Sequence, residues 1–178
     1  MIINRVWSMP NKWTFQIPPI ADLLARYVGD GKGWIDPFSG ENSPAEVTND
    51  LNPERPTKYH LDALEFLKQL YGYYSGVLFD PPYSLRQVKE CYESLGRDFT
   101  MHDSQDVGRW TEHKKTIASL IVPGGYALSF GWNSQGIGKQ NGFEIIEILL
   151  VCHGGAHSDT IVTVEKKVQS NFNTAILR

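Results

Sequence analysis

The chain contains the stretch Val77-Leu78-Phe79-Asp80-Pro81-Pro82-Tyr83, around which the rest of the sequence is organised. Three consecutive apolar residues predict a buried strand of a parallel sheet, since such strands are covered on both faces. The strand must end near Asp80, because the prolines that follow cannot donate hydrogen bonds to a sheet. Asp80 is therefore expected at the carboxyl end of a strand, the edge where open α/β sheets bind ligands.

Two prolines fix the backbone around this acid. Each holds its own φ and restrains the preceding residue, so the carbonyl groups of Asp80 and Pro81 point in directions set by the chain. The flat ring of Tyr83 follows directly and suits stacking on a heterocycle such as a nucleobase. We therefore regard Asp80, Pro81, Pro82 and Tyr83 as a candidate active site; the alternative is an ordinary turn with a buried tyrosine.

Length and composition fit one domain. With 178 residues, of which 41% are hydrophobic and 21% charged, residues 1–178 are expected to form a single domain with its own core. No apolar run is long enough for a membrane span or a secretory signal, which predicts a cytoplasmic protein. Cys91 and Cys152 are expected to be reduced. The net charge of -3 argues against tight binding of duplex DNA by the chain alone.

Short apolar strands alternate with amphipathic helices along the chain. The apolar spacing predicts helices over residues 20–28, 60–70, 85–95 and 110–121, and strands over residues 33–36, 46–50, 77–79, 126–130, 143–152 and 160–166. This alternation is typical of an α/β fold with a mostly parallel, doubly wound sheet. The last two strands are expected to form an antiparallel C-terminal hairpin.

Other segments are expected to lack regular structure. Residues 1–11 are predicted to be irregular, with Trp7 and Trp13 anchoring them to the body of the protein. Residues 96–109 are predicted to form a polar loop, and residues 123–125, Pro-Gly-Gly, a turn. The glycine-rich residues 131–142 are expected to form a loop at the carboxyl end of a strand.

A second motif, Asp36-Pro37-Phe38-Ser39-Gly40, also follows a predicted strand, and a glycine there lets the backbone approach a ligand. The two motifs resemble the Asp-Pro-Pro-Tyr motif and the Asp-Pro-Phe-x-Gly-x-Gly cofactor loop of the amino-methyltransferases that methylate exocyclic amines of nucleobases. The chain departs from the second pattern at Asn42, where that family has its final glycine. The resemblance implies a Rossmann-like class I fold that uses S-adenosylmethionine.

The resemblance also implies which residues hold the cofactor. Asp36, Phe38, Ser39 and Gly40 would form the cofactor loop, and Asp50 would hold the ribose. The alternative for Asp50 is a structural role as a turn or helix cap, since Asn and Pro follow closely.

Two further segments complete the implied cofactor site. Asp62 and Ala63 would meet the adenine, while Phe15 and Pro18, which lead into the first helix, would help to bind the methionine end. The alternatives are a first-turn helix acid for Asp62 and a hydrophobic staple for the segment that contains Phe15.

The chemistry follows from the nature of an aryl amine, whose lone pair is delocalised into the ring. Hydrogen-bond acceptors on its protons favour a pyramidal nitrogen, and Asp80 and the Pro81 carbonyl would be those acceptors. A duplex base must leave its stack to reach them, and Tyr83 would receive its face. Asp at the first motif position implies, by the resemblance, methylation of the N6 amine of adenine in DNA by a phage-type, adenine-specific enzyme.

The loop after the strand at 126–130 offers further substrate residues. Trp132 could contact the base, and Asn133 and Lys139 could contact phosphate; packing and solvation are the alternatives. No metal is expected, because the spacing of His153 and His157 fits a hairpin loop better than a zinc site.

No separate target-recognition domain is expected in so short a chain. The recognised sequence is therefore predicted to be short or loosely defined, or to be selected by a partner. A homodimer is an alternative that the sequence leaves open. By analogy, the small size fits a phage or mobile-element protein.

Two other functions also stay open. One is methylation of adenine or guanine in RNA, since rRNA guanine methyltransferases carry the same motif; the other is a non-catalytic module that binds nucleic acid or a protein partner.

Overall fold

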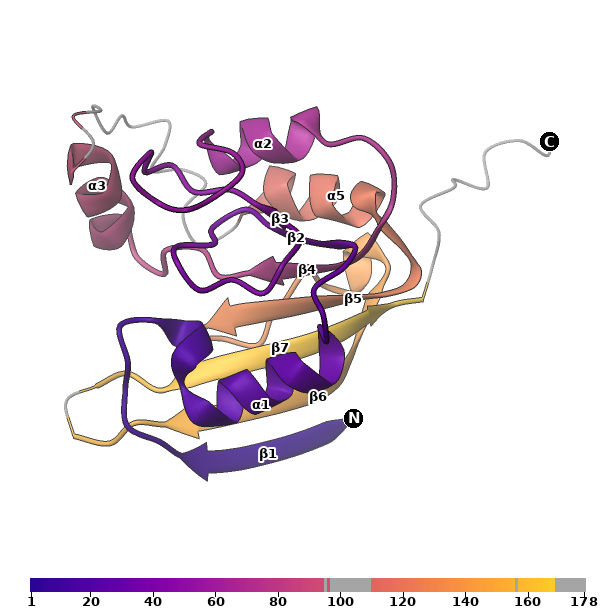
Figure 1. The fold of residues 1–178 in the computed structure, drawn as a ribbon. Coiled ribbons are helices and arrows are strands. Elements are labelled where there is room, and N and C mark those ends of the chain that lie inside the picture. The colour runs from indigo at the N-terminus through magenta and orange to yellow at the C-terminus, as the bar shows by residue number, and fades with distance from the viewer. Residues whose placement is uncertain (95, 97–109, 156, 169–178) are drawn as a thin grey trace.

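A mixed sheet forms the centre of the protein, in a computed structural model that describes residues 1–94, 96, 110–155 and 157–168 (Figure 1). Within these residues the sheet has seven strands: β1 (Ile2–Trp7), β2 (Trp34–Asp36), β3 (Val47–Thr48), β4 (Tyr74–Phe79), β5 (Ile121–Gly131), β6 (Phe143–Cys152) and β7 (Thr160–Lys167). Their order is β1-β6-β7-β5-β4-β2-β3, and β7 is antiparallel to its neighbours while the other pairings are parallel. The predicted fold class, a mostly parallel sheet with an antiparallel C-terminal hairpin, is confirmed.

The helices lie on both faces of this sheet. They are α1 (Pro18–Tyr27), α2 (Ala63–Gln69), α3 (Leu85–Ser94) and α5 (Thr111–Leu120), with short 3-10 helices η1 (Thr14–Gln16) and η2 (Lys139–Asn141). In Figure 1, α1 covers the near face, and α2 and α5 lie together on the other side. These helices match the predicted ones to within a few residues.

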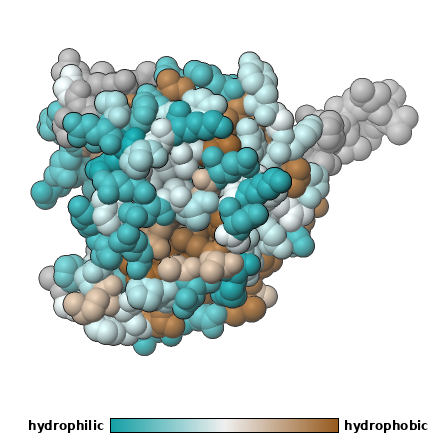
Figure 2. Space-filling view, in the orientation of Figure 1, coloured by the Kyte–Doolittle hydropathy of each residue, from teal (hydrophilic) through white to brown (hydrophobic). Residues whose placement is uncertain are grey.

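Helix α1 begins at two prolines, whose fixed φ suits the first turn of a helix. Ile20, Leu23 and Leu24 form its buried face and pack in one cluster with Trp34 and Leu78 of the sheet. In the orientation of Figure 1, a hydrophobic strip crosses the lower half of the surface near α1, below the hydrophilic loops (Figure 2).

The strand β4 is buried on both faces, as the sequence predicts. Leu78 faces the α1 cluster, whereas Val77 and Phe79 belong to the opposite cluster with Phe66 of α2 and Ile117 of α5. Alternate residues of a strand point to opposite faces, so a strand with helices on both sides is apolar throughout.

The prediction for residues 1–11 is wrong. The segment Ile2–Trp7 is an edge strand that pairs in parallel with β6, from Ile2 opposite Glu147 to Trp7 opposite Cys152. Five of its six residues are exposed, so the strand has no alternation between polar and apolar residues that could reveal it. Trp7 is 65% exposed and is no anchor, whereas Trp13 is half-buried.

The predicted turn at residues 123–125 is also wrong, because these residues lie inside β5. The pairing with β4 shifts between Ile121, which is opposite Tyr74, and Tyr126, which is opposite Gly76. The Pro-Gly-Gly sequence therefore makes an irregularity within the strand, where Gly124 takes a φ of 84°. The predicted polar loop at 96–109 lies, apart from Gly96, outside the described residues.

Within the described residues, neither Cys91 nor Cys152 forms a disulfide. In the part of the chain that the structure describes, no helix combines the length and the hydrophobicity that crossing a membrane requires.

Candidate active site

The order of the strands places a crevice between the two motifs. β2 and β4 are neighbours, but the chain continues from β2 to β3 on one side and from β4 to β5 on the other. At such a switch point the loops that follow the two strands diverge, and ligands bind between them. Asp36 is the last residue of β2, and Asp80 directly follows β4, so both acids lie at this point.

A cavity of about 560 Å³ occupies the crevice, a size typical of small-molecule sites. It brings together seven of the residues predicted from the sequence: Phe38, Gly40, Asp50, Asp62, Ala63, Asp80 and Pro82. They come from the loop after β2, the segment after β3, the start of α2 and the corner after β4. The cavity therefore joins five of the nine predicted cofactor residues to the predicted catalytic corner.

Asp36 shapes the loop that borders this cavity. Its carboxylate accepts hydrogen bonds from the Ser43 hydroxyl at 2.6 Å and from the Phe38 amide at 2.9 Å. Complete burial raises the pKa of Asp36 to about 7, although both hydrogen bonds oppose this shift. Asp36 is not among the residues that line the cavity, so its contribution is to the conformation of the loop.

Asp50 is tied to the same loop. It accepts hydrogen bonds from the amide of Gly40 at 3.0 Å and from that of Asn52 at 2.8 Å. Gly40 has a φ of 57°, which other residues adopt only with strain, and a Cβ there would lie 3.3 Å from the Trp13 ring. Each carboxylate oxygen keeps a lone pair, so Asp50 can cap its turn and still accept hydrogen bonds from a ligand.

Asp62 is the N-cap of α2 and accepts a hydrogen bond from the Leu64 amide at 2.9 Å, so it precedes the first-turn position considered for it and has a structural role as a cap. Its other oxygen accepts a hydrogen bond from the Tyr92 hydroxyl at 3.1 Å. Asp62 also lines the cavity, so the structural role leaves room for a binding role.

Sequence analysis missed Asn49, which holds this region together. Its buried side chain donates to the carbonyl groups of Pro37 and Leu61, both at 3.0 Å, and accepts from the Leu61 amide at 2.9 Å. Its backbone carbonyl accepts from the amide and hydroxyl of the buried Ser39. Nothing in the local sequence distinguishes this Asn, because its partners are distant in the chain.

The corner after β4 is held by its own side chains. The Tyr83 hydroxyl donates a hydrogen bond to Oδ1 of Asp80. Burial raises the pKa of Asp80 to about 6, although hydrogen bonds from Tyr83 and Thr14 oppose the shift. A second cavity, of about 410 Å³, lies on the outer side of this corner, where Thr14, Gln87 and Glu90 join the motif residues. Asp80 borders both cavities and is therefore accessible from two directions.

A third, smaller cavity of about 100 Å³ separates the corner from the loop after β5. Tyr83, Trp132 and Asn133 all line it, and the ring centroids of Tyr83 and Trp132 are 5.6 Å apart. The structure thus brings two of the three predicted substrate residues to the corner. Lys139 is in η2 instead, is exposed and lines none of these cavities.

Trp110 is the second residue that sequence analysis missed. It lines both the large cavity and the small one, and its ring lies 5.5 Å from that of Phe38. Its φ of 50° is the one positive value among the described residues other than glycine. Strained backbone of this kind concentrates at functional sites. The strain is held by packing against other elements, so the local sequence does not predict it.

Two predicted cofactor residues lie elsewhere. Phe15 is in the core, with its ring 5.0 Å from that of Phe130, and Pro18 is exposed in the first turn of α1. Neither lines the cavity. Within the described residues, no group of three or more His, Cys, Asp or Glu side chains could hold a metal ion.

No protein-family model matches the sequence, and no curated protein matches it significantly. Solved structures share its fold. TrmN from Thermus thermophilus matches 85% of this chain with a TM-score of 0.56 and 18% identity, and the chain spans 49% of TrmN. The N-methyltransferase NodS from Bradyrhizobium japonicum WM9 matches 84% of this chain and 94% of its own, with a TM-score of 0.53 and 9% identity.

A third structure, SMU.776 in complex with SAH, matches 83% of this chain and 48% of its own, with a TM-score of 0.50 and 10% identity. Similarity at these identities concerns the fold. The chain therefore has the Rossmann-like α/β fold of class I S-adenosylmethionine-dependent methyltransferases.

Proposed function

We propose that this protein transfers a methyl group from S-adenosylmethionine to the exocyclic N6 amine of adenine in DNA. The observation that carries the proposal is the corner after β4, where the carboxylate of Asp80 borders the large cavity while the adjacent Pro81 and Tyr83 line the small cavity. A group held in the large cavity and a base at the corner would meet at this carboxylate.

The large cavity fits S-adenosylmethionine in size and in chemistry. Besides Asp80 it offers two carboxylates, Asp50 and Asp62, for hydroxyl and amine donors, and apolar walls at Leu51, Leu61 and Val88 for a purine. Gly40 gives the loop a turn that a side chain would obstruct. When bound, the cofactor supplies an electrophilic methyl group on a sulfonium. SAH, its demethylated product, occupies SMU.776, which has the same fold.

Asp80 and the Pro81 carbonyl would act on the target amine. Both are acceptors, so they bind the two amine protons and favour the pyramidal nitrogen whose lone pair can attack. With a pKa of about 6, Asp80 is mostly ionised at neutral pH and can take the proton that the nitrogen releases. Most of the rate would come from holding the amine in position.

The rings of Tyr83 and Trp132 would hold the base. Both rings line the small cavity and contact each other, with centroids 5.6 Å apart, and an adenine that has left its stack presents flat faces on which aromatic rings can stack. This cavity is narrow as it stands, so the exposed ring of Trp132 would have to move for a base to enter between them.

The departure at Asn42 gives little support to a non-catalytic module. Asn42 accepts a hydrogen bond from Gln16 at 2.8 Å, its φ is negative, and it does not line the large cavity. Glycine is required at a close approach or at a positive φ, and neither condition holds here. The loop therefore tolerates Asn42 without closing the proposed cofactor site.

The test is methyl transfer to separate pools of duplex DNA, single-stranded DNA and RNA, followed by digestion and mass spectrometry of the nucleosides. We expect N6-methyladenine in DNA with the wild-type protein, and a loss of about 10²- to 10³-fold with Asp80→Ala and with Asp80→Asn. Both variants should bind S-adenosylmethionine normally in calorimetry. Asp22→Ala, which removes an exposed acid of α1, is the control and should keep full activity.

The same assay separates the alternatives. Methylated adenine or guanine in the RNA pool alone would replace DNA by RNA as substrate. Cofactor binding without transfer to any pool would contradict the proposed reaction, and failure to bind the cofactor as well would favour the non-catalytic module.

A further inference from the structure

A fourth cavity, of about 450 Å³, lies between α5 and the loop that contains η2. We call it the polar groove; the residues that line it are Thr111, Lys114, Lys115, Gln135, Gln140 and Asn141. Every one of these side chains can donate a hydrogen bond, and none is acidic. A hollow with this lining suits an anion that accepts several hydrogen bonds.

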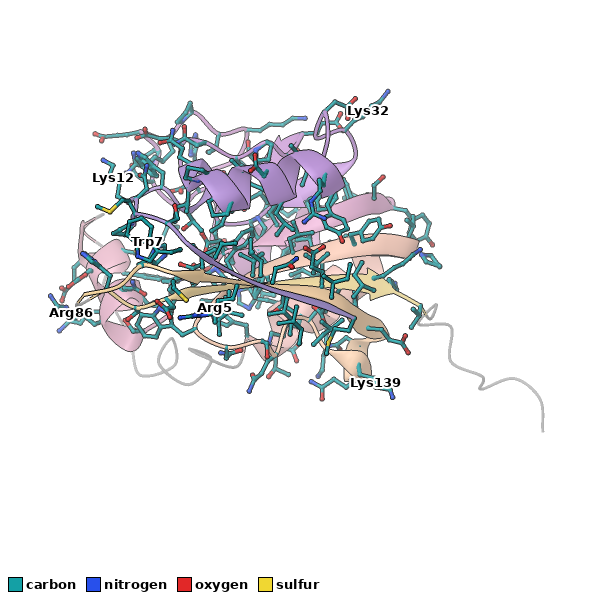
Figure 3. All side chains as sticks on the ribbon, turned by 90° about the horizontal axis from the view of Figure 1, so that it is seen from below. Arg5, Trp7, Lys12, Lys32, Arg86 and Lys139 are labelled. Atoms are coloured by element: carbon teal, nitrogen blue, oxygen red, sulfur yellow. The ribbon has the colours of Figure 1, made fainter. Side chains whose placement is uncertain are left out.

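The polar groove continues into the proposed base site. Lys114 and Gln135 line both the groove and the small cavity that Tyr83 and Trp132 also line. One path therefore leads from the place proposed for the target base to the lysines of α5. Lys139 adds an exposed positive charge from η2, on the side of the sheet away from Lys32 (Figure 3).

The charge of Lys114 is available to a ligand. Within the described part of the chain its ammonium group has no ion pair and no hydrogen bond, and the side chain is half-buried and lines both cavities. Burial lowers the pKa of Lys114, and Glu165 opposes that shift. Lys115 is less available, because it pairs with the exposed Glu112 at 3.1 Å.

Glu165 stiffens the wall of the groove without occupying it. Its buried carboxylate accepts hydrogen bonds from the amides of Ile137 at 2.6 Å and Gly138 at 2.9 Å. The loop closes tightly over it, since a Cβ on Gly136 would lie 2.2 Å from this carboxylate. The loop that carries Gln135 is thus held in place before any ligand arrives, which lowers the entropic cost of binding.

We infer that the polar groove binds the phosphodiester next to the target base, with Lys114 as its principal contact. The inference rests on the proposed function, because it requires a base between Tyr83 and Trp132. A nucleotide whose base enters that cavity brings its flanking phosphates to the rim, where the groove begins. Phosphate contacts supply most of the sequence-independent affinity for nucleic acid. Because the chain has a net charge of -3, such contacts require positive side chains gathered at one place on its surface.

The first test measures binding without turnover, by fluorescence anisotropy of a labelled single-stranded oligonucleotide over a range of salt concentrations. We expect Lys114→Gln to weaken binding about tenfold and to reduce the salt slope by about 0.7, since one phosphate contact is lost. Lys114→Arg should restore both values. Lys32→Gln, the control, removes an exposed lysine on the other side of the sheet and should change neither.

The second test uses substrates with and without phosphate. Lys114→Gln should raise the KM for a DNA oligonucleotide about tenfold and should change the KM for deoxyadenosine, which has no phosphate, far less. Comparing the KM of a matched RNA oligonucleotide with that of the DNA oligonucleotide shows which sugar-phosphate backbone the groove prefers.

These tests distinguish the phosphate site in the polar groove from the proposed methyl transfer. If the wild-type protein binds no oligonucleotide, or if Lys114→Gln behaves like Lys32→Gln, the groove is not a phosphate site. If oligonucleotide binding depends on Lys114 but neither nucleic acid nor nucleoside is methylated, the proposed reaction is contradicted while the phosphate site in the groove is supported. A similar loss with deoxyadenosine would assign Lys114 a structural role and overturn the inference.

Discussion

The phenolic hydroxyl of Tyr83 donates a hydrogen bond to Oδ1 of Asp80, three residues earlier at the same corner. This bond favours the ionised carboxylate and opposes the burial that raises the pKa of Asp80 to about 6. In the proposed reaction Tyr83 therefore has two functions: its ring receives the base, and its hydroxyl keeps the acceptor charged.

Tyr83→Phe should separate these functions, because it keeps the ring and removes the donor. Without the hydrogen bond the pKa of Asp80 rises further, so less of the carboxylate is ionised near neutral pH. We expect the acidic limb of the kcat/KM profile to move to higher pH, with activity low at pH 6.5 and mostly recovered at pH 8.5.

Tyr27→Phe is a matched control for this profile. It also removes a hydroxyl that donates to a carboxylate, that of Glu147 at 2.8 Å, but on the α1 side of the sheet. Its pH profile should match that of the wild-type protein. An unshifted profile for Tyr83→Phe would contradict the role given to the hydroxyl.

Asp36 should make the protein less stable as the pH rises. Its pKa is about 7 in the folded protein and near 3.8 in the unfolded chain, so its stabilising contribution is complete below pH 3.8 and is lost as the pH passes through 7. The shift predicts that this group lowers the free energy of unfolding by about 2 to 3 kcal/mol between pH 5 and pH 8. Urea denaturation at the two pH values measures it.

Asp36→Asn provides the comparison for stability. An amide can still accept a hydrogen bond from the Phe38 amide and can pair with the Ser43 hydroxyl, but it does not titrate. Its unfolding free energy should vary less between pH 5 and pH 8 than that of the wild-type protein. Equal variation in both proteins would show that the pH dependence arises elsewhere.

Asp50→Asn should weaken cofactor binding about tenfold, because it removes a charged acceptor from the large cavity. Calorimetry with S-adenosylmethionine and with SAH measures the change, and thermal unfolding checks that the loop around Gly40 survives. Asp22→Asn, an exposed acid of α1, should bind both ligands like the wild-type protein. Unchanged affinity for Asp50→Asn would leave Asp50 with its turn-capping role alone.

Trp132→Ala should raise the KM for a single-stranded oligonucleotide about tenfold, since stacking of a base on an aromatic ring contributes about 1 to 3 kcal/mol. Cofactor affinity should not change, because Trp132 does not line the large cavity. Trp7→Ala removes a ring of similar exposure, 65% against 51%, from the edge strand β1 and is the control. Equal KM values for the two variants would show that Trp132 does not contact the substrate.

Local patterns predicted the elements whose side chains are buried in a regular way. The triplet Val77, Leu78 and Phe79 indicated a central strand because helices cover both of its faces, and two prolines indicated the start of α1. The strand β1 was not predicted, since an exposed edge strand leaves no such pattern. The Pro-Gly-Gly sequence indicated a turn, but Ile121 before it and Tyr126 after it both pair with β4, so these residues lie within β5.

The sequence by itself determined the α/β class and the positions of Asp36 and Asp80 at strand ends, because each follows from short-range chemistry, while the acids of the proposed cofactor site were implied by the resemblance of the motifs. The tertiary structure alone decided which of these residues share a cavity, left Phe15 in the core, and added Asn49, Trp110 and the groove around Lys114. These contacts join segments that are far apart in the chain. Only the order of the strands brings them together, and no local pattern of residues encodes that order.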